Sequence, residues 1–303
     1  MVLNKGLIDL TIIADGAAID PFDISVANFE NQGTVETKGV LTSDKSGSFW
    51  TEGTIIVTSP TLTNLVGGQI GLNNSLLSIT SANGVTNDGT ITTVGSANAG
   101  GFGSIYIGGI LSGSGALSLE GRSQIELASS VGSGQTIDFV GSASSLTAEL
   151  RLDLPQFFSG TIDGFAHGNT IALAGIAVTG SSYTDGVLTL DEASGTVALA
   201  IPGNFISNDF VVTNKPNEAD VTLLCFCANT LILTPAGQRP VQELSIGDAV
   251  VTLRGEVRPI VWTGTGQVLA TPGRRTGNTP VIVRKGALAD AVPSRDLRAP
   301  HQR

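Results

Sequence analysis

Between residues 29 and 200, apolar residues alternate with small or polar ones in short runs that turn-forming residues separate. Many runs open with Asn or Gly, then Gly-Thr and an aliphatic residue, as in Asn31-Gln32-Gly33-Thr34-Val35 and Asn87-Asp88-Gly89-Thr90-Ile91. Alternation of this kind predicts strands with one buried face, and the preceding Asn and Gly residues predict turns. The chain is therefore expected to be mainly β.

The turn motif recurs at Gly33, Gly53 and Gly89, which are spaced by one or two units of about twenty residues. One such unit cannot bury its own apolar face, so the units must stack. Irregular repeats of this length favour a parallel β-helix, that is, a β-solenoid. An antiparallel β-sandwich is the competing architecture, since it also uses short strands and frequent turns. The residues expected to face the core are Val35, Ile55, Val57, Ile70, Leu72, Ile91, Ile105, Ile107, Leu117, Leu119, Ile125, Leu127, Ile137 and Phe139.

Three local features stand out from this pattern. In Gln135-Thr136-Ile137, a glutamine stands where the other units have glycine. Asp185-Gly186 precedes an apolar run and predicts a hairpin or turn. Asp163 and His167 flank Phe165 and are interpreted as part of a surface loop.

The composition agrees with a β-rich fold. Glycine accounts for 39 of 303 residues, and charged residues for 14% against an average of about 25%. Glycine and β-branched residues form helices poorly. No apolar run reaches the ~18 residues of a membrane-spanning helix, and the first residues lack the apolar core of a signal peptide.

Charge divides the chain. Residues 1–224 carry 6 basic and 21 acidic residues, whereas residues 225–303 carry 10 and 5. The overall charge of −10 argues against nucleic-acid binding. The change of sign predicts a boundary near residue 224, with a β-repeat domain at 1–223 and a second domain at 224–303.

Cysteine and histidine are too rare for most metal or disulfide chemistry. The cysteines are Cys225 and Cys227, and the histidines are His167 and His301. Two cysteines exclude a disulfide framework. A four-ligand zinc site would need all four residues, with His167 in the other domain, so no metal and no cofactor is predicted.

A run of short motifs begins at Cys225. In order, they are Cys-Phe, Thr-x-Ile, Thr-Pro-x-Gly, Val-x-Glu-Leu, Ile-Gly-Asp, Val-x-Thr and Val-Trp-x-Gly. This run resembles the opening of the Hint domain, the module shared by hedgehog autoprocessing domains and inteins. It is most similar to bacterial Hint-domain proteins in which the module follows a Gly-rich, adhesin-like β-repeat region. The resemblance covers about the last quarter of the chain, and Asn229 replaces the glycine that usually precedes the Thr.

The resemblance implies a partial all-β Hint module with self-processing chemistry. Cys225 would be the nucleophile that attacks the carbonyl of Leu224, converting the Leu224–Cys225 peptide bond to a thioester. His301 is the candidate acid, but Ala299-Pro300-His301 lacks the hydroxyl residue of the family's motif, and further strands of the family are absent. The module is therefore expected to be truncated and impaired. Thr230, Gly247 and Asp248 are expected to form turns.

The resulting functional hypothesis is an adhesin-like surface or secreted β-helix protein with a Hint module that acts on its own chain. A surface glycan or a protein is the expected ligand of the β-helix, and the location is expected to be extracellular. The alternative is a structural or binding β-helix protein with an inert Hint remnant. A polysaccharide lyase or hydrolase would need carboxylates or basic residues clustered on one strand face, and the six basic residues of the first domain look scattered in the sequence.

Overall fold

The computed structural model describes most of the first 223 residues and part of the remainder. Those from Val2 to Leu223 belong to one compact unit, and those from Thr230 onward belong to a second. The described ranges are 2–12, 22–25, 28–44, 47–51, 54–96, 101–141, 147–223, 230–252, 255–261, 263, 281–283 and 297–299.

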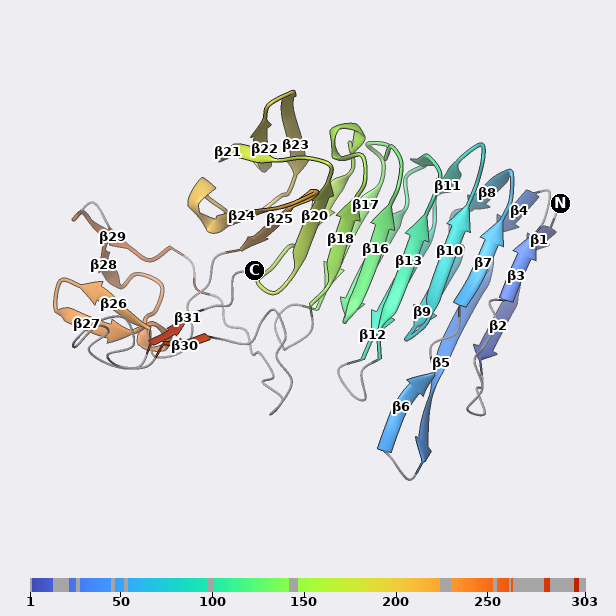
Figure 1. Cartoon of the computed structure of the whole chain (residues 1–303), viewed down its shortest axis with the longest axis horizontal. Coiled ribbons are helices and arrows are strands. Elements are labelled where there is room, and N and C mark those ends of the chain that lie inside the picture. The colour runs from blue at the N-terminus through green and yellow to red at the C-terminus, as the bar shows by residue number, and fades with distance from the viewer. Residues whose placement is uncertain are drawn as a thin grey trace. The chain divides into compact units, whose positions relative to one another are not determined.

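The first unit is a β-solenoid built from three parallel sheets (Figure 1). Each coil contributes in turn a strand or an isolated bridge to the first sheet, then a strand to the second and a strand to the third. The first sheet contains β1 (Val2–Asn4), β4 (Asn28–Asn31), β8 (Thr61–Asn64), β11 (Val85–Asn87) and β14 (Leu111–Ser112). It continues as parallel bridges from Leu111 to Val131 and from Val131 to Phe158.

The other two sheets repeat in the same way. The parallel strands of the second sheet are β2 (Leu7–Ile12), β5 (Thr34–Asp44), β9 (Gln69–Asn73), β12 (Thr90–Gly95), β15 (Ala116–Gly121), β17 (Thr136–Val140) and β19 (Thr161–Asp163). The parallel strands of the third sheet are β3 (Phe22–Ser25), β7 (Thr54–Thr58), β10 (Leu76–Thr80), β13 (Gly103–Ile107), β16 (Ser123–Leu127), β18 (Glu149–Leu152) and β20 (Thr170–Ala174). The strand β6 (Gly47–Thr51) pairs antiparallel with the end of β5.

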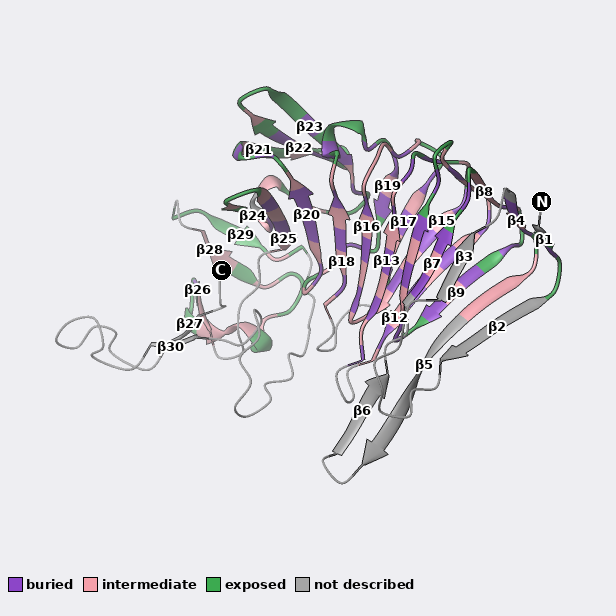
Figure 2. Cartoon of the chain, turned by 45° about the vertical axis from the view of Figure 1, so that its right-hand side comes forward, coloured by how far each residue is buried: buried purple, intermediate pink, exposed green. Residues whose placement is uncertain are grey.

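Parallel pairing confirms the predicted solenoid and shows that the sandwich alternative is wrong. The register aligns equivalent apolar residues in successive coils, for example Ile91 with Leu117 and Leu117 with Ile137. Buried and half-buried residues alternate along strands such as β13, β16 and β18 (Figure 2). Every predicted core residue is buried except Val35, which is partly buried and packs against the core.

A ladder of buried amides runs along the turn between the first and second sheets. The side chains of Asn4, Asn31, Asn64 and Asn87 are linked in succession, with each Nδ2 donating to the Oδ1 of the next at 2.8 Å. Asn87 then donates to Oε1 of Gln135 at 3.1 Å. Because buried amides are costly without partners, the ladder explains why Asn recurs at this turn.

Antiparallel strands close the C-terminal end of the solenoid. They are β21 (Val178–Thr184), β22 (Val187–Glu192), β23 (Gly195–Ala200), β24 (Phe210–Lys215) and β25 (Glu218–Leu223). The predicted turn is confirmed, since Asp185 and Gly186 have φ of 51° and 83° and join β21 to β22. Two short 3₁₀ helices, η2 (Pro155–Phe157) and η3 (Ser207–Asp209), lie in connections of this unit.

Aromatic rings fill the core beneath these closing strands. The rings in contact, with centroids 5.2–6.5 Å apart, belong to Phe139, Phe165, Tyr183, Phe205 and Phe210. The side chain of Asn214 in β24 also exchanges two hydrogen bonds with the backbone of Val178, at 2.9 and 2.8 Å. These bonds use backbone groups at the start of β21 that would otherwise be open to further pairing.

The second unit consists of short antiparallel pairs. Its elements are β26 (Leu231–Thr234), β27 (Gly237–Pro240), the 3₁₀ helix η4 (Val241–Glu243), β28 (Ala249–Val251), β29 (Val257–Pro259), β30 (Val281–Val283) and β31 (Leu297–Ala299). The strands pair as β26–β27, β28–β29 and β30–β31. In the part of the chain that the structure describes, no helix is long and apolar enough to span a membrane.

Candidate functional site

The predicted scissile bond follows a strand that is paired on both sides. β25 ends at Leu223, its register partner Phe210 lies in β24, and β20 pairs with its other edge. Leu223 is partly buried and packs against the solenoid core. The segment that leads to the predicted cleavage point is therefore anchored in the first unit.

The predicted reacting residues lie outside the described residues. These are Leu224, Cys225 and the candidate acid His301, and Cys227 and Asn229 lie outside them as well. Of the predicted site residues, the structure describes Thr230, Gly247 and Asp248. The carbonyl of Thr230 accepts a hydrogen bond from the amide of Val241 at 2.8 Å, which ties the start of β26 to the end of β27.

The Thr-Pro-x-Gly motif forms the turn between β26 and β27. The hydroxyl of Thr234 donates to the carbonyl of Gly237 at 2.6 Å and accepts from the amide of Ala236 at 3.2 Å. Gly237 has a φ of 111°, a region that side chains with a Cβ rarely adopt. The spacing of Thr and Gly in this motif is thus a requirement of the turn.

The Ile-Gly-Asp motif organises a second turn, at the start of β28. Asp248 Oδ2 accepts the amide hydrogen of Ser245 at 3.0 Å and pairs with the guanidinium of Arg239 at 3.2 Å. Backbone bonds from Gly247 to Ile260 and from Ile260 to Asp248 join this turn to the end of β29. The carboxylate of Asp248 therefore connects the turn before β28 to β27, which is a structural role.

The second unit buries little in its described part. Thr234 is the one buried residue among those from Thr230 to Thr263 for which burial is described. Four large apolar side chains there are exposed, namely Leu233, Ile246, Val257 and Val261. These hairpins are held by hydrogen bonds and turn geometry more than by an apolar core of their own.

The family comparison concerns this second unit. Residues 224–303 match the family model of the Hint domain. The chain therefore carries a Hint domain. The match begins at Leu224, one residue before Cys225, and the solenoid lies outside it. Among curated proteins, none matches the chain.

A group of charged side chains lies on the outer face of the third sheet. Arg151 in β18 bonds Glu218 at 2.6 Å and Asp153 at 3.0 Å, and its Nε lies 3.8 Å from Glu126. Lys215 bonds Glu218 at 2.6 Å and Asp220 at 2.7 Å. We call these six residues the ion-pair cluster. It joins the last parallel strands of the sheet to the closing strands β24 and β25.

The ion-pair cluster was missed in the sequence because its members are far apart along the chain. Arg151 is 67 residues from Glu218. Register brings them together, since Glu126 is aligned with Arg151, Arg151 with Ala172, and Ala172 with Asp220. The view that the basic residues of the first domain are scattered is wrong for Arg151 and Lys215, which both bond Glu218. One signal was available in the sequence: Glu126 and Arg151 each alternate with buried apolar residues, so both could be predicted to point away from the core.

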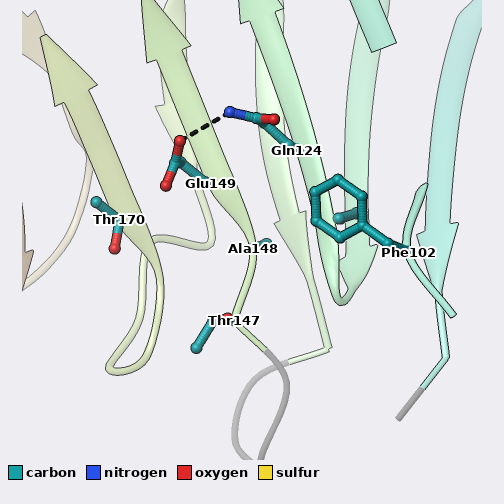
Figure 3. A pocket seen from close by; sticks show the side chains of 7 residues that line it. Phe102, Gln124, Thr147, Ala148, Glu149 and Thr170 are labelled. Carbon is teal, nitrogen blue, oxygen red and sulfur yellow. Dashed lines mark hydrogen bonds between the residues drawn. The ribbon is translucent and has the colours of Figure 1, made fainter. Parts of the chain in front are cut away.

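A small open pocket of about 160 Å³ lies beside this cluster. Gln124 and Glu149 form its centre and are joined by a hydrogen bond of 2.8 Å from Nε2 to Oε1. Phe102 lies on one side of this pair and Thr170 on the other, with Thr147 near the start of β18 (Figure 3). Ser123 also lines the pocket, and its buried hydroxyl has no hydrogen-bond partner among the described residues.

The carboxylates near the pocket differ in electrostatic environment. Burial is the main cause of the raised pKa of Glu149, and repulsion from Asp220 and Glu218 adds to it. Glu126 also has a raised pKa, caused first by burial and then by the nearby Asp153. Hydrogen bonds from Lys215 and Arg151 lower the pKa of Glu218. The cluster thus stabilises the charge of Glu218, whereas Glu149 carries a charge that its surroundings disfavour.

The Asp163 and His167 pair forms no site in the described structure. Both residues are exposed, and Asp163 accepts a hydrogen bond from the amide of Gly164 at 2.9 Å. Burial of part of the ring lowers the pKa of His167. The interpretation as a surface loop is confirmed for His167, which lies in a turn, and is wrong for Asp163, which is the last residue of β19.

Proposed function

We propose that the Hint domain cleaves its own chain at the Leu224–Cys225 peptide bond. The observation that carries this proposal is the family match to residues 224–303, which starts at the residue before Cys225. A cysteine at that position provides a thiolate that is both a strong nucleophile and a good leaving group. Each molecule would react once, within itself, and no cofactor takes part.

The proposed reaction has two steps. In the first, Sγ of Cys225 attacks the carbonyl carbon of Leu224, the C–N bond breaks, and the departing nitrogen takes up a proton to become the free amine of Cys225. This leaves Leu224 as a thioester on the Cys225 sulfur. In the second, water or an added thiol attacks the thioester, so that residues 1–224 leave as a carboxylate or a new thioester and the Cys225 thiol is regenerated.

The position of the solenoid's closing strands supports cleavage at this peptide bond. β25 ends at Leu223 and keeps both of its neighbouring strands on the N-terminal side of the proposed cleavage point. Cleavage after Leu224 would break none of these pairings. We propose that the released solenoid stays folded and acts outside the cell, as an adhesin-like surface or secreted module for a glycan or protein ligand.

One observation favours a second candidate function, in which the Hint domain is inert. The described hairpins of this unit expose Leu233, Ile246, Val257 and Val261 and bury only Thr234. A catalytic site needs rigid support to hold a nucleophile and a proton donor in place. On this alternative, the chain is a binding solenoid with an unreactive C-terminal domain.

Intact-mass measurement of the purified chain decides between these functions. The chain is incubated at neutral pH with and without a small thiol, alongside Cys225→Ala and the matched control Cys227→Ala. Self-cleavage predicts a species of residues 1–224 and one of residues 225–303, with faster formation in thiol, loss in Cys225→Ala and retention in Cys227→Ala. A single full-length mass in every sample would overturn the proposal and leave the inert Hint domain. Loss in Cys227→Ala alone would assign the nucleophile to Cys227.

A further inference from the structure

The pocket on the outer face of the third sheet contains a carboxylate without an ionic partner. In the described part of the chain, no Lys or Arg lies within ion-pair distance of Glu149, although both cations of the ion-pair cluster are close by and are used by other carboxylates. The bond from Gln124 occupies Oε1 of Glu149. Among the described residues, the other oxygen of this carboxylate has no hydrogen-bond donor.

The surroundings of Glu149 have a surplus of negative charge. The ion-pair cluster has four carboxylates and two cations, and Glu149 adds a fifth carboxylate. One oxygen of Asp220 is buried without a hydrogen-bond partner among the described residues. A positively charged group at the pocket would therefore meet attraction from several directions, whereas an anion would be repelled.

The other residues that line the pocket indicate which kind of cation it would bind. Phe102 provides an aromatic ring at one side of the pocket (Figure 3), and aromatic rings attract ammonium and guanidinium groups. The hydroxyls of Thr147 and Thr170 provide neutral oxygen acceptors. The volume of about 160 Å³ is well below the ~300–1,000 Å³ of pockets for drug-sized ligands. The pocket thus has room for a single head group and not for a large molecule.

The geometry points to a binding site for an organic cation, in which Glu149 pairs with an ammonium or guanidinium group and Phe102 packs against its alkyl stem. A lysine or arginine side chain of a partner protein carries this chemistry. The ion-pair cluster has a separate role, since its cations hold β24 and β25 to the sheet and, in the described structure, form no ion pair with Glu149. This site is independent of the proposed cleavage.

Ligand titration of the full chain at neutral pH and constant ionic strength tests the site. The probes are N-acetyl-lysine amide, N-acetyl-arginine amide and the uncharged N-acetyl-glutamine amide, measured by calorimetry or ligand-observed NMR. We expect saturable binding of one or both cationic probes and none of the neutral one. Which cation binds more tightly identifies the head group. No saturable cation binding to the wild-type chain would overturn the site.

Matched variants separate this site from general charge attraction. Glu149→Gln keeps the shape and the contact with Gln124, and is expected to weaken binding about tenfold, since a charge-assisted bond is lost. Phe102→Leu is expected to weaken binding about two- to fivefold. Glu120→Gln removes a carboxylate from the second sheet, where Glu120 is the last residue but one of β15, and should leave binding unchanged. Equal weakening in Glu120→Gln and Glu149→Gln would contradict the proposal, and thermal unfolding of each variant checks that it folds.

Discussion

Gln135 is hydrogen-bonded to Asn87 although one complete coil of the solenoid lies between them. The amide of Asn87 donates to Oε1 of Gln135 at 3.1 Å, and Nε2 of Gln135 donates back to the carbonyl of Asn87 at 2.8 Å. In the intervening coil, Gly113 occupies the register position of Asn87, so this coil adds no amide to the ladder. The longer side chain of Gln135 spans the gap.

This relationship explains the one glutamine in the Gly-Thr pattern. Gln135 is aligned with Gly115, and its side chain is fully buried. It also donates to the carbonyl of Ser112 at 3.0 Å. The exception to the sequence repeat is therefore a polar residue that completes the ladder where Gly113 leaves it open.

Removing this glutamine should destabilise the solenoid. Gln135→Ala leaves a cavity and unpaired buried groups on Asn87 and Ser112, and we expect a loss of about 1–3 kcal/mol in the free energy of unfolding. Chemical denaturation monitored by circular dichroism measures this loss. Gln69→Ala, at an exposed position of β9, is the matched control and should change stability by less than ~0.5 kcal/mol. Equal effects of the two substitutions would show that the ladder contributes nothing at Gln135.

Substitution of Gly113, which lies in the coil between Asn87 and Gln135, should also destabilise the solenoid. Gly113 has a φ of 97°, and a Cβ added there would lie 2.4 Å from the carbonyl oxygen of Asn87. Gly67 has a similar φ of 81°, but a Cβ there meets nothing within 4 Å. We expect Gly67→Ala to cost about 1–2 kcal/mol from backbone strain alone, and Gly113→Ala to cost clearly more. Denaturation of the two variants side by side measures the difference, and a smaller loss for Gly113→Ala would contradict the contact.

The solenoid could be predicted because its strands are short and each has one buried face. Alternation identified inward residues such as Ile105 and Leu127, and stacking follows once every unit needs a neighbour to cover its apolar face. The Asn ladder was visible only as a recurring turn residue, since nothing in the sequence shows that Asn31 and Asn64 bond each other through their side chains. The role of Gln135 needed the register, which sets Gly113 opposite Asn87.

The two candidate sites differ in how much of each could be predicted from the sequence. The Hint motifs are contiguous, so local turn chemistry around Thr234 and Asp248 could be inferred from spacing. The pocket at Glu149 depends on residues from three neighbouring strands, and their register is fixed by turn lengths that vary from coil to coil. Sequence order alone did not place Gln124 beside Glu149.

The ion-pair cluster should make the stability of the closing strands depend on pH. Its cations lower the pKa of Glu218 in the folded chain. Because the pKa of Glu218 is lower in the folded chain than in the unfolded chain, its ionised carboxylate stabilises the folded chain. This contribution to stability is fully present above about pH 4.3, the ordinary pKa of Glu. It is lost as the pH falls through the pKa of Glu218 in the folded chain. We expect the stability difference between the wild type and Glu218→Gln to be about 1 kcal/mol at pH 7 and to shrink toward pH 3. Urea denaturation at both pH values measures it, and a difference that grows on acidification would contradict the assignment.

Asp248 should be needed to hold the turn before β28, through its hydrogen bond as well as its charge. Its carboxylate accepts a hydrogen bond from the amide of Ser245 and pairs with Arg239. Asp248→Ala therefore removes the side-chain partner of this turn amide and leaves the Arg239 guanidinium with its bond to the carbonyl of Glu243. We expect faster hydrogen exchange at the amides of Ser245 and Gly247 and, if the chain cleaves itself, slower cleavage. Glu256→Ala is the control, because Glu256 makes an exposed ion pair with Arg258 and exposed pairs contribute little. Exchange at Ser245 reports on the turn whether or not cleavage occurs, so unchanged exchange in Asp248→Ala would contradict a structural role for the motif even in an unreactive chain.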